Sequence, residues 1–186
     1  AADYYVVLDS HFSNTEPLPF TLGLARVQEI AGTAVIGGFV SGALAVPGEY
    51  HSYQFALSDT TRFIVGDAGS GSGIRWRLQP VGGSPGVWQT FSANPAGNPV
   101  QWFNAGDYIL TVSTTSVSGD DYRVQLLDLS RASALQTNGV TATLLQGRNA
   151  VAYGFDIAVA QRMRVAIDTP DSAKLSWTVY GGSSGQ

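Results

Sequence analysis

Apolar side chains recur at every second position in several runs of this chain, and this period of two constrains its fold most strongly. The clearest runs are residues 53–57, 108–113, 122–127 and 163–167. Such a run places alternate side chains on the buried face of a sheet and the others toward solvent. Segments rich in glycine, proline and asparagine separate the runs. The pattern predicts an all-β fold, an antiparallel sandwich or barrel, with helical turns at most at residues 22–30 and 130–135.

Part of the sequence is repeated with an offset close to one hundred residues. The residues 53–55 recur at 153–155, and an arginine, Arg62 or Arg162, stands seven positions after each phenylalanine. An apolar run that ends in aspartate follows each arginine, and a tryptophan run closed by two glycines comes next. The shared order of these elements indicates tandem structural units.

The repeat divides the chain into three parts. Residues 24–129 hold one complete sandwich, and residues 130–186 hold the first half of another. Residues 1–23 form a strand and a linker, because residues 3–8 resemble the closing strand at residues 121–126. Unpaired strand edges of a half sandwich favour addition of a strand. We predict that residues 1–9, with Tyr4, Val6 and Leu8 as the assembly strand, complete a half sandwich, either in the same chain or in another copy.

The order of motifs suggests a family. The motifs are Gly42-x-Leu44, Pro47-Gly48, Tyr53-x-Phe55, Trp76-x-Leu78-x-Pro80, Asn104-Ala105-Gly106-Asp107-Tyr108-x-Leu110-x-Val112 and Tyr122-x-Val124-x-Leu126. This order resembles the bacterial pre-peptidase C-terminal type of β-sandwich and its relatives in large secreted surface proteins. The resemblance covers residues 24–129 fully and 130–182 partly. It implies a jelly-roll-like sandwich that accompanies other domains and has no catalysis of its own.

Composition and charge exclude several classes of protein. The chain has 186 residues and no cysteine, so disulfides, thiolate catalysis and cysteine-bound metals are excluded. A net charge of -4 argues against nucleic acid as a partner. No apolar run approaches the ~20 residues that a membrane helix needs, so we expect no direct membrane insertion.

The sequence also argues against an enzyme. His11 and His51 are its only histidines, and we expect both to lie in surface loops. No nucleophile elbow, phosphate-binding loop or zinc-protease motif is present in the sequence. We therefore predict no catalytic residue and no required cofactor.

A calcium site is the first alternative to a purely structural role. The resemblance implies calcium binding in some relatives attached to collagenases, through aspartate-rich edges. Here the expected acidic cluster is reduced to Asp67, with a Gly-Ser segment at residues 69–73. The candidate metal ligands are Asp67, Asp120 and Asp121, which would need carbonyl oxygens to complete a calcium shell. The competing interpretation is that these aspartates cap turns.

Exposed aromatic side chains would indicate a second alternative, binding of a polysaccharide. The candidate residues are Trp88, Trp102 and Tyr108, since a flat exposed ring can stack on a sugar. The competing interpretation places both tryptophans in the core. Trp76 and Trp177 occupy equivalent repeat positions, and we expect both in cores. Arg75 and Arg77 flank Trp76 on the opposite, solvated face.

We therefore predict a non-enzymatic structural, adhesion or assembly module of a larger bacterial protein, located outside the cell or on its surface. Its expected partners are neighbouring domains or copies of the same protein. The alternatives are a carbohydrate- or polymer-binding accessory module of a secreted hydrolase and a calcium-stabilised sandwich.

Overall fold

The computed structural model describes residues 5–8, 16–17, 19, 29–91, 100–136, 139–142, 144, 150–157, 164–169, 175 and 177–181. These residues form strands, turns and extended segments and no helix, so the predicted all-β class is confirmed. Among them there is accordingly no helix long and apolar enough to cross a membrane.

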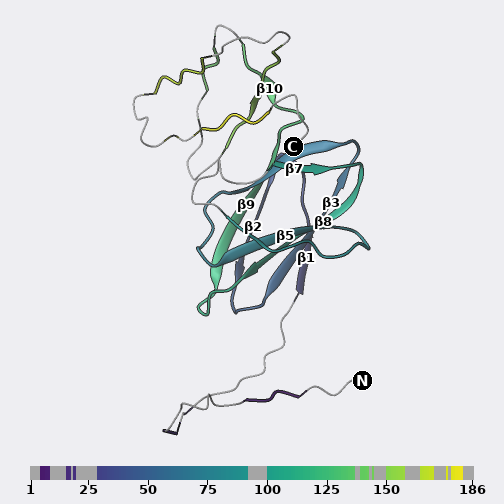
Figure 1. Ribbon diagram of the computed structural model, residues 1–186, viewed down its shortest axis with the longest axis vertical. Coiled ribbons are helices and arrows are strands. Elements are labelled where there is room, and N and C mark those ends of the chain that lie inside the picture. The colour runs from purple at the N-terminus through teal and green to yellow at the C-terminus, as the bar shows by residue number, and fades with distance from the viewer. Residues whose placement is uncertain are drawn as a thin grey trace.

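Two sheets face each other in the centre of the molecule (Figure 1). The five-stranded sheet has the order β1 (Glu29–Thr33), β3 (Tyr50–Leu57), β8 (Gly106–Thr114), β5 (Ile74–Pro80) and β6 (Gln89–Thr90). The four-stranded sheet has the order β2 (Phe39–Leu44), β9 (Asp120–Asp128), β4 (Thr61–Asp67) and β7 (Val100–Phe103). Together they form a sandwich within the predicted unit at residues 24–129.

One strand pair in the sandwich departs from the antiparallel expectation. β1 runs parallel to β3, with Glu29 opposite Tyr50, whereas the other sandwich pairs are antiparallel. The reason is the path of the chain, because it leaves β1, forms β2 in the opposite sheet and only then returns to β3. Two reversals restore the original direction.

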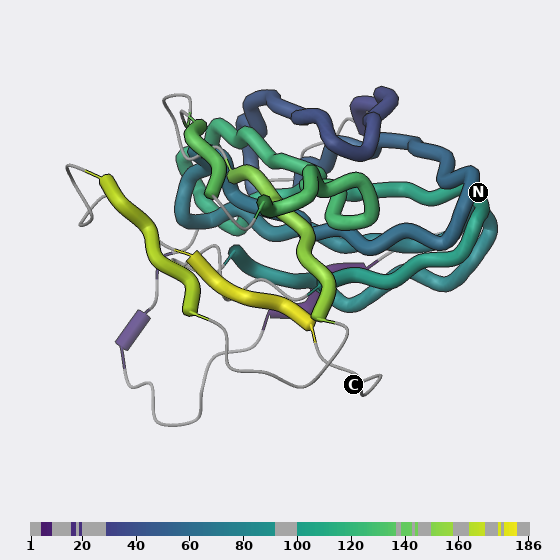
Figure 2. The backbone as a smooth tube through the Cα atoms, turned by 90° about the horizontal axis from the view of Figure 1, so that it is seen from above, coloured from purple at the N-terminus to yellow at the C-terminus, as the bar shows by residue number. Residues whose placement is uncertain are grey.

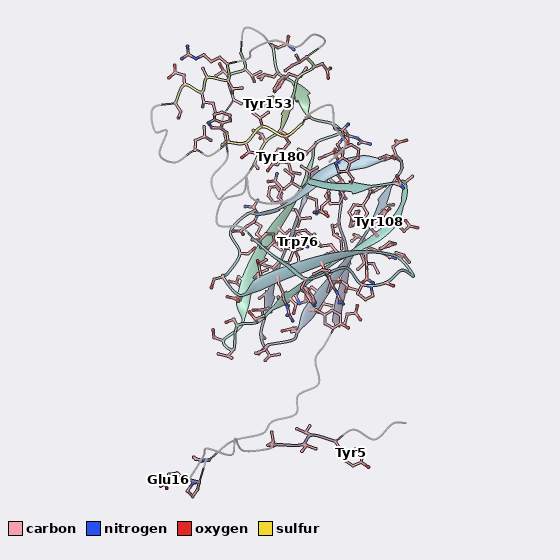
Figure 3. All side chains as sticks on the ribbon, in the orientation of Figure 1. Tyr5, Glu16, Trp76, Tyr108, Tyr153 and Tyr180 are labelled. Atoms are coloured by element: carbon pink, nitrogen blue, oxygen red, sulfur yellow. The ribbon has the colours of Figure 1, made fainter. Side chains whose placement is uncertain are left out.

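The core fills the space between the two sheets. The inward set predicted from sequence is confirmed on β8 and β9, since Tyr108, Leu110, Val112, Val124 and Leu126 are all buried. The predicted solvent exposure of the alternate set is wrong in part, because Thr111, Ser113 and Gln125 are buried as well. Aromatic contacts connect the sheets, with ring centroids 5.9 Å apart for Phe55 and Phe63 and 4.6 Å apart for Phe103 and Tyr108. Trp76 lies between the sheets as predicted, with 2% of its surface exposed (Figure 3). These contacts explain why aromatic residues recur on inward positions.

The C-terminal part lies outside the two sheets (Figures 1 and 2). Its described strands are β10 (Ser133–Ala134) and β11 (Tyr153–Gly154), which pair in parallel. The side-chain amide of Gln125 on β9 donates to the Ala150 carbonyl at 3.1 Å and accepts from the Ala150 N–H at 3.0 Å. This pairing attaches the C-terminal part to the outer face of the four-stranded sheet.

Two expectations for the C-terminal part are wrong. Residues 130–135 form a turn and β10 rather than a helix, because Asp128 accepts hydrogen bonds from the N–H groups of Ser130 and Arg131, and Leu135 N–H donates to Gly154. Trp177 is 56% exposed and so is no core residue. The described residues there provide no second sheet layer to cover it. Most of the other helical candidate, residues 22–28, lies outside the described residues.

Candidate functional site

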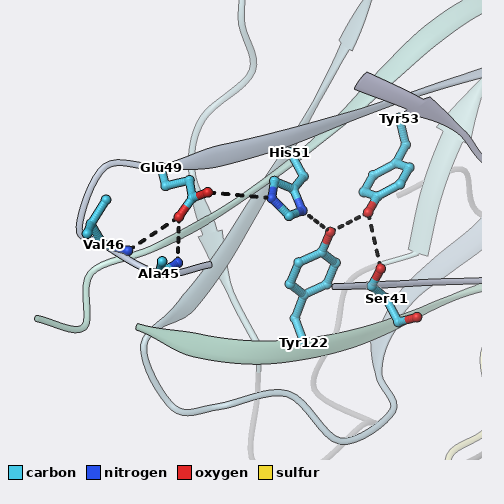
Figure 4. A network of polar contacts seen from close by, with 7 residues as sticks. All are labelled: Ser41, Ala45, Val46, Glu49, His51, Tyr53 and Tyr122. Carbon is cyan, nitrogen blue, oxygen red and sulfur yellow. Dashed lines mark hydrogen bonds and ion pairs between the residues drawn. The ribbon is translucent and has the colours of Figure 1, made fainter. Parts of the chain in front are cut away.

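A network of polar side chains lies between the two sheets (Figure 4). His51 on β3 is 4% exposed, and its Nδ1 lies 2.6 Å from the hydroxyl of Tyr122 on β9. The Tyr122 hydroxyl also forms a hydrogen bond with the Tyr53 hydroxyl, which donates to the Ser41 carbonyl at 3.4 Å. The network therefore connects a strand of one sheet to two strands of the other.

Glu49 extends this network toward the surface. Its Oε1 lies 3.9 Å from His51 Nε2, and its Oε2 accepts hydrogen bonds from the backbone N–H groups of Ala45 and Val46. The turn before β3 thus holds the carboxylate beside the imidazole. Since the two groups are separated by 3.9 Å, this contact is electrostatic rather than a hydrogen bond.

Sequence reasoning placed His51 in a surface loop, and this expectation is wrong. β3 begins at Tyr50, so His51 has the same inward orientation as Tyr53, Phe55 and Leu57. The signal was present in the sequence, because His51 stands two positions before the first aromatic residue of the alternating run. The other histidine, His11, lies outside the described residues.

Two glycines leave the space that the network occupies. A Cβ on Gly42 would lie 2.8 Å from the Tyr122 hydroxyl and 3.0 Å from His51 Nδ1. A Cβ on Gly32 would lie 3.0 Å from the ring of Tyr53. Any larger residue at position 42 would therefore displace the hydrogen bond between His51 and Tyr122. Sequence analysis noted Gly42 only as part of a motif.

Burial keeps the network uncharged at its centre. Desolvation lowers the pKa of His51, and the nearby Glu49 carboxylate offsets this effect only in part. Burial and the hydrogen bond with Tyr53 raise the pKa of Tyr122. A neutral imidazole bonded to a neutral phenol suits a structural link between the sheets rather than proton transfer at a substrate.

The lowered pKa of His51 predicts that acid destabilises the protein. The unfolded chain binds a proton at His51 near the ordinary pKa of 6.5, whereas the folded chain binds it only at lower pH. The free energy of unfolding is therefore highest above pH 6.5 and falls as the pH drops below it, by about 1.4 kcal/mol for each unit of pKa lowering. Urea unfolding of the protein and of His51→Gln between pH 7.5 and 5 measures the effect.

The control for this experiment is His11→Gln, which removes the chain's other histidine. We expect His11→Gln to keep the loss of stability at low pH and His51→Gln to reduce it. An unchanged pH dependence in His51→Gln would contradict the assignment.

The candidate ligand-binding aromatics do not share a surface. Trp102 on β7 is 61% exposed and packs against the Arg62 guanidinium, 4.4 Å from the ring centroid, on the outer face of the four-stranded sheet. Trp88 is half-buried and packs against arginines of β5, in the five-stranded sheet. Tyr108 is buried, stacks on Phe55 and donates its hydroxyl to the Asn104 carbonyl at 3.0 Å. The ring of Tyr108 therefore belongs to the core.

The candidate calcium ligands serve turns and strand ends. Asp67 Oδ1 accepts hydrogen bonds from Gly69 N–H at 2.9 Å and from Ser70 N–H at 2.6 Å. Asp120 accepts one from the Thr114 hydroxyl at 2.7 Å, and Asp121 is exposed. In the part of the chain that the structure describes, no group of three or more His, Cys, Asp or Glu side chains could hold a metal ion. A calcium-stabilised module stays a prediction.

The described part of the assembly strand is exposed. Val6 and Leu8 have exposed fractions of 66% and 54%, and Tyr4 lies outside the described residues. Residues 5–8 form no strand ladder with any other described segment. Completion of the C-terminal part by this segment stays a prediction, as do the domain boundaries on either side of the sandwich.

The structure is similar to one from the family that the sequence resembles. This is the pre-peptidase C-terminal domain of collagenase from Bacillus anthracis, with a TM-score of 0.41 and 13% sequence identity. The match covers 56% of this chain and 99% of that domain. No family model matches the sequence, and a comparison with curated proteins finds no match either.

Proposed function

We propose that this chain is a non-catalytic module of an extracellular or cell-surface bacterial protein and that it assembles by donating residues 4–8 to a neighbouring copy. The observation that carries the proposal is the exposure of four consecutive apolar side chains. Tyr5, Val6, Val7 and Leu8 have exposed fractions of 86, 66, 86 and 54%. A β-branched, aromatic segment of this kind favours pairing with a sheet edge.

The C-terminal part is the proposed acceptor. Several of its described side chains are apolar and leave more than a third of their surface exposed, namely Val151, Phe155, Ile157, Val165, Ile167, Trp177 and Val179. A strand that covers them would contribute about 25 cal/mol for each square ångström of apolar surface buried. The apolar donor segment therefore complements an incompletely covered apolar surface.

The positions of donor and acceptor favour pairing between chains. Residues 5–8 lie beyond one end of the sandwich, and β10 and β11 lie beyond the other (Figure 1). A contact between two different surfaces of successive copies is heterologous, so it continues from copy to copy and can form an open chain. Pairing within one chain, the alternative from the sequence, would instead give a monomer.

The network around His51 supports the non-catalytic part of the proposal. The imidazole is buried, and its Nδ1 is bonded to Tyr122. A general base has to lie within hydrogen-bond reach of the substrate proton that it removes. His51 in this position instead links the sheets.

Val6→Arg combined with Leu8→Arg tests the proposed assembly. We expect the molar mass of the unchanged protein, measured by light scattering, to rise with concentration above that of one chain. The double variant should stay monomeric and keep the melting temperature of the sandwich, since both side chains are already exposed.

Val35→Arg combined with Val117→Arg is the matched control, because these valines are 74% and 88% exposed on the sandwich itself. This control should assemble like the unchanged protein. A protein that is monomeric at all concentrations, or a Val6 and Leu8 variant that still assembles, would overturn the proposal.

A further inference from the structure

An arginine pair and a tryptophan lie together on the outer face of the five-stranded sheet. Arg75 and Arg77 alternate along β5 with the buried residues Ile74, Trp76 and Leu78, so they point away from the core. Their guanidinium carbons lie 4.5 and 4.6 Å from the ring centroid of Trp88. One indole therefore holds two guanidinium groups in place through cation–π contacts.

Polar atoms beside this indole are buried without hydrogen-bond partners. Among the described residues, the Nε atoms of Arg75 and Arg77 and the Oε1 atom of Gln79 are inaccessible and unbonded. All three belong to outward-facing side chains of one strand. Buried polar atoms are normally hydrogen-bonded, so these three atoms are unusual. Because they are inaccessible, a ligand would bind the terminal Nη groups of the two arginines rather than these atoms.

No carboxylate of the described residues compensates the charges of the arginine pair through an ion pair. Within the described ranges, Arg131 forms an ion pair with Asp128, whereas neither Arg75 nor Arg77 takes part in one. Two like charges held on one ring repel each other, and an anion placed between them would remove this repulsion. Stacking on an aromatic ring leaves the N–H groups at the edge of a guanidinium available for a carboxylate.

Small hydroxyl residues line the sheet next to the pair. In the register of β5 and β8, Ser113 lies opposite Arg75 and Thr111 lies opposite Arg77. Both side chains alternate with the inward-facing Leu110 and Val112, so they lie on the outer face beneath the arginine side chains, where they are buried, with 3% of Thr111 and 1% of Ser113 exposed. The part of the site that a ligand can reach thus consists of two cations and an aromatic ring, supported from below by two buried hydroxyl residues.

We propose that the surface formed by Arg75, Arg77, Gln79 and Trp88 binds the uronate groups of an acidic polysaccharide. Guanidinium groups bind carboxylates through paired, charge-assisted hydrogen bonds, and an aromatic ring packs on the apolar face of a sugar. This inference does not depend on strand donation by residues 4–8.

Binding of polygalacturonate by the full chain tests the inference. We expect isothermal titration at 0.15 M salt to detect binding of polygalacturonate and not of dextran, a neutral polysaccharide. Arg75→Gln combined with Arg77→Gln should weaken binding at least about tenfold, because the paired hydrogen bonds to the carboxylates are lost. Far-UV circular dichroism of the variant checks that the sandwich is intact. Arg75→Lys combined with Arg77→Lys keeps the charge but loses the planar donors, and it should also bind more weakly.

Arg62→Gln combined with Arg123→Gln is the matched control. This variant removes the same total charge from two other cation–π pairs, those with Trp102 and Phe39 on the opposite sheet. It should bind polygalacturonate as tightly as the unchanged protein does. Equal weakening in both glutamine variants would mean that net charge alone acts, and it would overturn the inference. Absence of polygalacturonate binding by the unchanged protein would also overturn the inference. If monomeric galacturonate, added at the same uronate concentration, displaced polygalacturonate from the protein, the proposal that the ligand is a polysaccharide would be overturned.

Discussion

Trp76→Ala is expected to lower the free energy of unfolding by about 3–5 kcal/mol, which is a large share of the stability of a domain of this size. The indole is 2% exposed and packs against Phe91 with ring centroids 6.2 Å apart. Its Nε1 has no hydrogen-bond partner among the described residues, so the loss comes from packing and from the cavity left behind. Urea unfolding followed by circular dichroism measures the change.

Trp102→Ala is the matched control for this variant. Trp102 is 61% exposed, and its main described contact is the cation–π pair with Arg62. An exposed pair of this kind contributes about 0.5–1 kcal/mol, so we expect a change of that size at most. Equal destabilisation by the two alanine variants would contradict the assignment of Trp76 to the core.

Gly42→Ala is expected to have the second largest effect, a loss of about 1–3 kcal/mol from overpacking. The added Cβ would lie 2.8 Å from the Tyr122 hydroxyl, inside the space that the network occupies. Either the strand or the tyrosine has to move, and the hydrogen bond between Tyr122 and His51 is then lost. Unfolding in urea at pH 7.5 measures the stability, since His51 is neutral there.

Gly66→Ala provides the control in the same sheet. A Cβ at position 66 would have its nearest neighbour, the Gln125 carbonyl oxygen, at 3.9 Å. Because alanine restricts the unfolded chain more than glycine, this variant should be neutral or more stable by about 0.4–1 kcal/mol. We therefore expect the free energy of unfolding to decrease in Gly42→Ala and to stay the same or increase in Gly66→Ala. Destabilisation of similar size at both positions would mean that the network does not require Gly42.

The inward residues of β3, β8 and β9 were predictable because alternation is a local property. Trp76 and Leu110 were assigned to the core from their neighbours two positions away, and both are buried. His51 was missed for a related reason, since a polar side chain before Tyr53 was taken as the end of the pattern. The alternation in fact continues to it.

The repeat was a poorer guide to the C-terminal part. Tyr153 falls in the short strand β11, in line with its counterpart Tyr53 in β3. Trp177 matches Trp76 in sequence but is 56% exposed. A tryptophan is buried only where a second layer covers it, and a sequence repeat does not say whether that layer is present.

The sequence by itself determined most of the inward side chains of β3, β8 and β9, because the two faces of a strand follow from a period of two. Only the tertiary structure decided which distant strands meet. It places β2 beside β9, so Gly42 lies opposite Tyr122, and it sets β3 across the core from them. It also brings Trp88 over the arginines of β5. Pairing between residues far apart in the chain depends on the whole packed assembly, so local patterns do not encode it.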